Sequence, residues 1–202
     1  MEGMTNEKFA DQHLALSWFK SLEPVLPDEM TGLWKGRGIP SGHPLDGVLE
    51  NLNWFGKRFH PDQKADALLF QWQPRRLVAI EPSYFPIEVA IRLAPIGYSS
   101  LARKVFAYGQ RFLRARGTTA SLTLRASQYD DTAAMVYDKQ PITDYFRRIG
   151  ENKLAGMMVA KGDERHYFFS LERVFSLDDP PLGKKPRSQA ATSSARSCLP
   201  FV

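Results

Sequence analysis

The sequence predicts an α+β protein in which a curled antiparallel β-sheet or small lipocalin-like β-barrel is accompanied by an N-terminal helix and a central basic amphipathic helical segment. Three observations lead to this prediction. Short apolar runs follow one another between residues 120 and 174 at a spacing typical of an antiparallel meander. A glycine-rich stretch, 31–47, sets a tryptophan on one face of an earlier strand. Between these two regions lies an arginine-rich stretch with helical periodicity, residues 86–117.

The elements of the first half are expected in the following order. A helix over residues 6–22 is indicated by apolar side chains at helical spacing, and prolines end it. A short helix is expected over 45–55, where Pro44 stands at a favourable first position and five apolar side chains form one stripe. The apolar runs 66–72 and 75–82 are joined by a turn that contains proline, and they predict a β-hairpin or two successive strands.

The strand in the glycine-rich stretch is expected to turn Trp34 inward. Alternate residues of a strand share a face, and the long cations Lys35 and Arg37 on the opposite face belong in water. Glycine inside a strand is unfavourable by roughly 0.5–1 kcal/mol relative to alanine, so glycines beside Trp34 indicate room for a bulky neighbour. Either packed side chains or a ligand can occupy that room. If this face is internal, Arg173 of the last strand is expected to cover the Trp34 ring as a structural cation–π pair.

The 202 residues are expected to form one domain over 1–177, made of a first half at about 20–85, a helical connector at 86–117 and a strand meander at 118–177. Residues 178–202 are polar and rich in proline and lysine, and they predict a disordered tail. The single cysteine excludes an intramolecular disulfide, and with no leader or long apolar run in the sequence we expect a cytoplasmic protein. Despite the net charge of +5, no nucleic-acid motif is present, and nucleic-acid binding is not expected.

Two parts of the chain resemble a known family. The stretch GLWKG at 32–36, followed by GHPLDG and WFGKRF, resembles the GXWXG family. The stretch from AAMVYDKQPITDYFRRI to HYFFSLERV is similar to the companion domain of unknown function that normally follows it. Together the two resemblances cover roughly residues 20–175. They imply an architecture but no agreed activity or catalytic residues, so the chemistry has to be argued from this chain.

The sequence contains no nucleotide or cofactor motif, and its four histidines are too dispersed for a recognisable metal site. We therefore expect neither a cofactor nor a metal. The candidate catalytic residues are His43, Asp46 and Asp144, since these side chains can move protons near neutral pH. For His43 and Asp46, capping of the following short helix is the alternative role.

Asp144 lies on a strand face that is otherwise apolar, so we expect it to be buried with a raised pKa or a partner. A structural pairing with Arg147 or Arg148 is the alternative to a role as a general acid. Lys57 and Arg58 stand between two phenylalanines, and one of them is expected to point inward and bind a ligand oxygen. The side chains expected to line the ligand site are Trp34, Trp54, Lys57, Arg58, Met135, Tyr137, Phe146, Tyr167 and Phe169.

An aromatic cavity with a few polar groups predicts an apolar ligand of polyketide, isoprenoid or acyl type, and cofactor-independent isomerisation, cyclisation or elimination. The alternative is a non-catalytic carrier of a lipid, terpenoid or haem, with His166 or His60 as the axial haem ligand and the basic helix 101–116 contacting a membrane. A third possibility is a packed barrel whose basic helix contacts a protein. Weak contact with an anionic membrane and a homodimer are left open.

Overall fold

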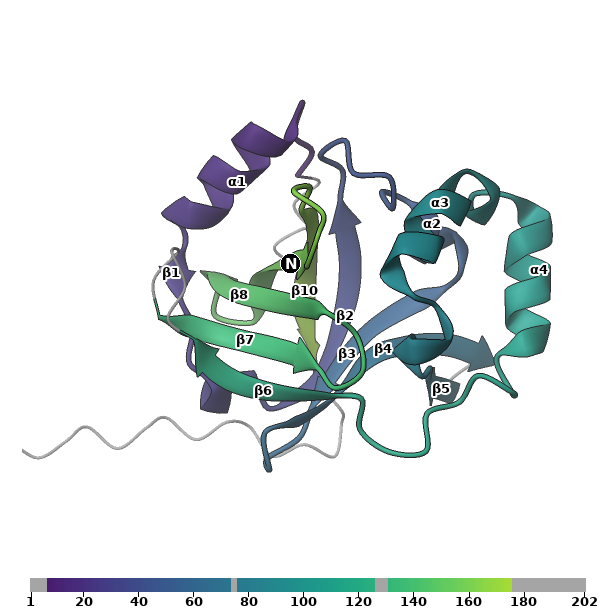
Figure 1. Ribbon diagram of the computed structural model, residues 1–202. Helices are drawn as coiled ribbons and strands as arrows, with labels where there is room; N and C mark the ends of the chain where they lie inside the picture. Colours follow the sequence, from purple (N-terminus) through teal and green to yellow (C-terminus); the bar gives the residue numbers. More distant parts are fainter. Residues whose placement is uncertain (1–6, 74–75, 126–130, 176–202) are drawn as a thin grey trace, which may run out of the picture.

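A closed antiparallel β-barrel with short helices around it forms the body of the protein (Figure 1). The computed structural model describes residues 7–73, 76–125 and 131–175. The barrel strands are β2 (Gly32–Ile39), β3 (Trp54–Phe59), β4 (Lys64–Gln73), β6 (Ala120–Arg125), β7 (Thr132–Tyr137), β8 (Ile142–Gly150), β9 (Lys153–Ala160) and β10 (Tyr167–Val174). Two short strands, β1 (Glu23–Pro24) and β5 (Arg76–Ala79), pair with β8 and β4. The predicted α+β class with a small barrel is confirmed.

Around the barrel the strands follow the order β2, β3, β4, β6, β7, β8, β9 and β10, and β10 pairs back onto β2. The five strands from β6 to β10 confirm the predicted meander. The shortest pairing joins β4 to β6, where only Lys64 and Ala65 find partners. Farther along, the same edge of β4 pairs with β5 instead. The barrel wall is therefore least continuous where the helical connector leaves and re-enters it.

Helices lie on two sides of the barrel (Figure 1). They are α1 (Gln12–Ser21), α2 (Val48–Asn51), α3 (Ile87–Gly97) and α4 (Ser100–Gly109), with 3₁₀ turns η1 (Pro27–Met30) and η2 (Pro82–Tyr84). Helix α1 buries Ala15 and Phe19 against the outer face of β9 and β10, whereas α2, α3 and α4 gather on the other side. No helix in the described ranges is long and apolar enough to cross a membrane.

Two predicted elements differ from the structure. The helix expected over 45–55 is limited to the four residues of α2, because Asn53 adopts a positive φ of 62° and Trp54 begins β3. Pairing of β3 with β2 and β4 overrides the local helical spacing. The central helical segment is divided into α3 and α4, and the Ser99 side chain caps α4 by accepting a hydrogen bond from the backbone N–H of Ala102. The predicted tail, 178–202, lies outside the described residues.

The glycines of β2 face the barrel interior and leave room for large rings, as the sequence indicated. A Cβ on Gly36 would collide with the ring of Trp54. Trp34 is buried on the same face, and its indole Nε1 donates a hydrogen bond to the carbonyl oxygen of Met30 at 2.6 Å. The guanidinium carbon of Arg173 lies 4.2 Å from the centre of the Trp34 ring, which confirms the predicted cation–π pair. Trp34 and Arg173 thus pack together inside the barrel wall.

A bulge in β3 decides which of its side chains enter the interior. The register between β3 and β4 shifts on both sides of Gly56, whose φ is 145°. A Cβ at this position would collide with the carbonyl oxygen of Trp34. Because a bulge resets the alternation of faces, Trp54 and Lys57 are both buried although they are three positions apart. Simple alternation along the strand would have placed them on opposite faces.

Candidate functional site

A buried ion pair lies in the interior of the barrel. The Nζ of Lys57 is 2.8 Å from Oδ2 of Asp144, and the two side chains are 2% and 1% exposed. Lys57 also donates a hydrogen bond to the carbonyl oxygen of Ala67 at 3.0 Å and contacts the hydroxyl of Tyr137 at 3.3 Å. The Tyr137 hydroxyl in turn donates to Oδ2 of Asp144 at 3.4 Å. An ammonium, a carboxylate and a phenol therefore form one connected cluster.

The inward orientation of Lys57 confirms that one of the two neighbouring cations enters the barrel. Arg58 takes the opposite face of β3, where its side chain is 42% exposed and lies 3.7 Å from Oδ2 of Asp66. Asp144 and Met135 stand opposite each other on β8 and β7, and both are buried. Strand β3 and the consecutive strands β7 and β8, which are distant from it in sequence, thus bring the charged cluster together.

Burial governs the acidity of this cluster. It raises the pKa of the Asp144 carboxyl above its ordinary value, against the opposing effects of the Lys57 charge and of hydrogen bonds from Lys57 and Tyr137. Burial and the nearby Asp144 carboxylate raise the pKa of the Tyr137 phenol well above 10. Tyr137 therefore stays a neutral hydrogen-bond donor, and the Asp144 carboxyl holds its proton to a higher pH than an exposed aspartate does.

Aromatic side chains enclose the ammonium group of Lys57. Its Nζ lies 5.1 Å from the ring centre of Phe169, 5.7 Å from that of Tyr137 and 5.8 Å from that of Trp54. Phe146 meets Phe169 edge to face at 6.1 Å, and Tyr167 stacks on Phe169 at the same distance. The predicted lining residues other than Trp34 and Arg58 are thereby gathered around the ion pair.

Three buried polar atoms in this interior have no hydrogen-bond partner among the described residues. They are Nε1 of Trp54, Oδ1 of Asp144 and the hydroxyl of Tyr167. An unpaired buried polar group is destabilising by about 1–3 kcal/mol, so unpaired groups are uncommon in folded proteins and call for an explanation. Two of these atoms are hydrogen-bond donors, and the third, a carboxylate oxygen, is an acceptor. A guest with oxygen atoms would match this set.

His43 and Asp46 lie in a loop at the end of β2, apart from the ion pair. Oδ2 of Asp46 accepts hydrogen bonds from the backbone N–H groups of residues 41–43 at 2.8 to 3.0 Å, which organises the loop. Nδ1 of His43 accepts from the backbone N–H of Leu45, and burial lowers the pKa of the ring to about 4. The His43 ring is centred 5.6 Å from that of Tyr167. His43 thus borders the aromatic interior, whereas Asp46 holds the loop.

The suggested pairing of Asp144 with a neighbouring arginine is wrong. Arg147 lies on the opposite face of β8 and donates hydrogen bonds to the carbonyl oxygens of Lys20 and Leu22 at the end of α1. Arg148 pairs with Glu29 at 2.7 Å. The sequence also gave no sign of the Ala67 carbonyl oxygen as a partner of Lys57, since any residue type supplies a backbone oxygen.

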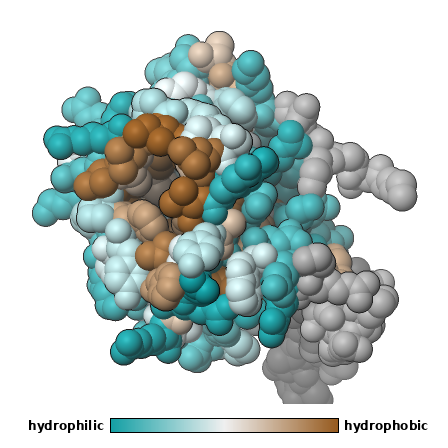
Figure 2. Space-filling view, turned by 90° about the vertical axis from the view of Figure 1, so that its right-hand side faces the viewer, coloured by the Kyte–Doolittle hydropathy of each residue, from teal (hydrophilic) through white to brown (hydrophobic). Residues whose placement is uncertain are grey.

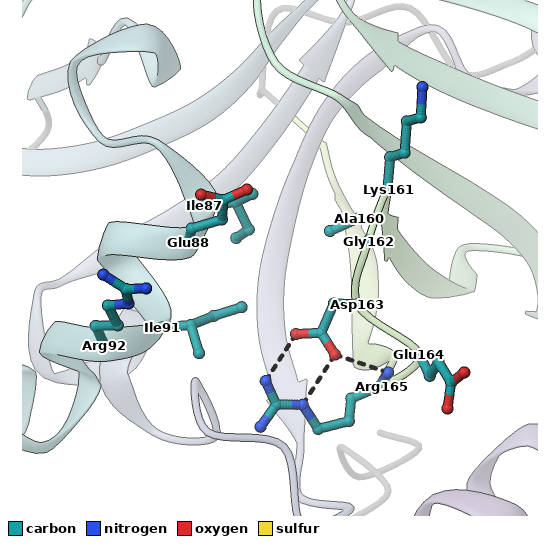
Figure 3. A pocket seen from close by; sticks show the side chains of 10 residues that line it. All are labelled: Ile87, Glu88, Ile91, Arg92, Ala160, Lys161, Gly162, Asp163, Glu164 and Arg165. Carbon is teal, nitrogen blue, oxygen red and sulfur yellow. Dashed lines mark hydrogen bonds and ion pairs between the residues drawn. The ribbon is translucent and has the colours of Figure 1, made fainter.

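A surface depression of about 600 Å³ lies beside one end of the barrel. In Figure 3, Ile87 and Ile91 of α3 border one side, and the turn from Ala160 to Arg165 borders the other. A second depression of about 560 Å³ shares Ile91, Arg92 and Arg165 with it. Neither Lys57 nor Asp144 lines these depressions. However, Ile87 and Ala160 also belong to the core cluster that fills the barrel.

The histidines considered for haem lie elsewhere. Nε2 of His60 is 3.2 Å from Oδ2 of Asp66 on the β3–β4 side of the barrel. His166 is half-buried next to Phe168, on the face that α1 covers, and its backbone N–H donates to the Gln12 side chain. Within 7–73, 76–125 and 131–175, no three His, Cys, Asp or Glu side chains are close enough to hold a metal ion.

Comparison with known proteins supports the barrel fold and the two-part organisation of the chain. The GXWXG protein family matches residues 17–73, and the domain of unknown function DUF4334 matches residues 119–173. No curated protein matches the chain. A protein from Thermomonospora curvata, solved by crystallography, is 28% identical, with a TM-score of 0.59 over 83% of this chain and 90% of that one. The first match contains Lys57 and the second contains Asp144 and Tyr137, so the ion pair joins the two matched regions. The chain thus combines a GXWXG family region with a C-terminal DUF4334 domain.

Proposed function

We propose that this protein binds an apolar small molecule of polyketide, isoprenoid or acyl type in its barrel and catalyses a cofactor-independent proton transfer on it. The result would be an isomerisation, a cyclisation or an elimination. The observation that carries the proposal is the presence in the barrel interior of three unpaired polar atoms, on Trp54, Asp144 and Tyr167, together with the buried ammonium of Lys57. Apolar sites with a few convergent polar groups are the usual form of small-molecule sites.

The roles of the cluster follow from its chemistry. Asp144 removes a proton from a carbon next to a carbonyl group, and the C–H electron pair moves into an enolate. The Lys57 ammonium stabilises the negative charge on the enolate oxygen, as a preorganised charge does in a site shielded from water. Asp144 then returns the proton to another carbon, so that no external oxidant or reductant is needed. Asp46 has no step in this scheme, because its Oδ2 holds the loop.

A route into the barrel is required, because aromatic side chains separate the ion pair from the surface. The depression beside α3 supports a route at this end, since Ile87 and Ala160 line it and also belong to the core. Ala160 pairs with Ile142, two residues before Asp144 on β8. Residues two apart on a strand are about 7 Å apart, so the depression and Asp144 are separated by one layer of side chains. Movement of α3 would open this path.

Two measurements test the proposal. Native mass spectrometry of the freshly purified protein, compared with the denatured and extracted sample, would identify a molecule that co-purifies. Titration with β-ionone, an apolar isoprenoid enone, would be followed through quenching of tryptophan fluorescence. We expect saturable quenching in the wild type and in Arg58→Met, where the removed cation lies outside the barrel, and at least tenfold weaker binding in Lys57→Met.

Catalysis is tested separately from binding. In D₂O, bound β-ionone should exchange the hydrogens next to its carbonyl group for deuterium, and NMR would record the rate. We expect Asp144→Asn to lose the exchange while still quenching, because the amide cannot take up the proton. Binding without exchange in the wild type would favour the carrier function over the enzyme. A protein that neither binds the enone nor carries a co-purifying molecule would contradict both.

A further inference from the structure

Helices α3 and α4 expose a large apolar surface, which is not part of the barrel site. Figure 2 shows hydrophobic side chains gathered around a hollow on this side of the molecule. In and just after α4, exposed fractions are 68% for Leu101, 63% for Val105 and 69% for both Tyr108 and Phe112. On α3 the exposed apolar side chains are Val89, Leu93 and Ile96. We call these seven residues the cap face. Contiguous apolar patches of this kind usually mark an interaction site.

Helix α4 leaves its apolar stripe of Leu101, Val105 and Tyr108 exposed, because it packs on the barrel through a different side. Phe106 meets Phe70 of β4 at 4.8 Å and Phe85 at 6.1 Å. No residue of α4 is fully buried. The apolar stripe of the helix therefore faces away from the core, which is the reverse of the usual pattern for a surface helix.

Positive charge is concentrated in the same segment. Residues 86–117 hold six basic side chains and a single acidic one, and the rest of the chain holds 21 of each. The net charge of +5 is thus that of this segment. Arg111 lies over the rings of Tyr108 and Phe112 at 4.3 and 4.6 Å, and Arg103 and Lys104 are exposed between the apolar residues. Apolar, aromatic and basic side chains are interleaved on one surface.

We propose that the cap face docks on an anionic lipid bilayer. Helices that bind in the plane of a membrane place leucine and aromatic side chains at the boundary of headgroups and acyl chains, and lysine and arginine at the lipid phosphates. The excess of positive charge complements the negative surface of such a bilayer. The charge distribution selects this occupant, because an apolar protein partner or a second copy of the chain would not need the cations Arg103, Lys104 and Arg111 among the apolar residues.

This docking stands apart from the chemistry proposed for the barrel, and its test needs no barrel ligand. The full chain would be mixed with phosphatidylcholine vesicles, with and without about one third phosphatidylserine, and floated in a density gradient. We expect the protein to float with the serine-containing vesicles in low salt and to be released by high salt, since salt screens surface charges.

Charge reversal gives the sharper comparison. The double variant Arg103→Glu and Lys104→Glu should lower vesicle binding by at least tenfold, because each cation near an anionic surface strengthens binding by about fivefold. The matched control is Lys35→Glu with Arg37→Glu, which reverses two exposed charges on the outer face of β2. The control should keep most of its binding. Equal losses in the two variants would overturn the proposal, since net charge rather than this face would then drive binding.

The apolar contribution has its own pair of variants. Val105→Ser removes an exposed cap-face side chain, and Leu14→Ser removes one that is 49% exposed on α1. Binding should fall severalfold in the first and stay unchanged in the second, with circular dichroism confirming the fold of both. No flotation with anionic vesicles in low salt would overturn the proposal. If vesicle binding is absent, a dimer measured by light scattering that dissociates in Val105→Ser would also overturn the proposal.

Discussion

Replacing Lys57 with methionine tests what the buried ion pair contributes to stability. The substitution keeps the length of the side chain and removes the charge, so Asp144 loses the partner that lies 2.8 Å away. Removing one member of a buried pair typically lowers the free energy of unfolding by about 3–5 kcal/mol, because the other charge stays buried. For a domain of this size, that corresponds to a decrease in Tm of roughly 10 °C. Removing both charges in Lys57→Met with Asp144→Leu should recover most of the loss.

The loss should depend on pH in a defined direction. Asp144 has a raised pKa in the folded protein, and removing Lys57 raises it further, since the Lys57 charge lowers it. A carboxyl group with a raised folded-state pKa contributes most stability when it is protonated, below the unfolded value of about 4. This contribution is lost as the pH rises through the folded-state pKa. The deficit of Lys57→Met should therefore be small near pH 4 and grow towards neutrality.

Urea unfolding, followed by tryptophan fluorescence at several pH values, measures these differences. Arg58→Met serves as the control, because its exposed pair with Asp66 is expected to contribute less than about 1 kcal/mol. Three results would refute the reasoning: a Lys57→Met variant as stable as the wild type at neutral pH, a deficit that does not change with pH, or a double variant no more stable than Lys57→Met.

Two further predictions concern His43 and Gly36. Burial lowers the pKa of His43 from 6.5 to about 4, so its stabilising effect is present above pH 6.5 and is lost as the pH falls through 4. The full effect on the free energy of unfolding is about 3 kcal/mol. Unfolding measured between pH 4 and 6.5 should therefore show a smaller loss of stability on acidification in His43→Leu than in the wild type. An equal loss in the two proteins would contradict this prediction. Gly36→Ala should destabilise the fold by about 1–3 kcal/mol through collision with Trp54. Gly150→Ala, which meets open space, should have little effect, and similar Tm values for the two would argue against the packing explanation.

The sequence predicted strands best where alternation is clear and turns are well marked, as in the five strands after residue 120. Alternation along two strands, together with the similar pair in lipocalin-like barrels, led to the correct prediction that Arg173 covers Trp34. The strand β3 was missed because its first residues also fit a helical stripe, and the bulge at Gly56 breaks its alternation. The partner of Asp144 was assigned to its neighbours in sequence, whereas Lys57, which is distant in sequence, reaches it across the barrel.

Periodicity shows which side chains share a face but not which face is covered. The stripe from Leu101 to Tyr108 was read correctly as helical and apolar, whereas the helix predicted over 101–116 ends at Gly109 and leaves Phe112 in a turn. Only the packing of Phe106 on Phe70 shows that the stripe is exposed. Likewise, the sequence indicated that one of Lys57 and Arg58 would enter the barrel. The bulge at Gly56 decides which one, and no local pattern reveals a shift of register against another strand.

The ion pair between Lys57 and Asp144 has a consequence for how such a chain can change during evolution. Each charge of the pair lies in a different matched region, so each region alone would place one unpaired charge in the barrel interior. A hybrid gene that took one region from a relative with an apolar residue at the partner position would inherit a lone charge in its core. The two regions would therefore have to change together at Lys57 and Asp144, whereas the ion pair places no constraint on the helical connector between them.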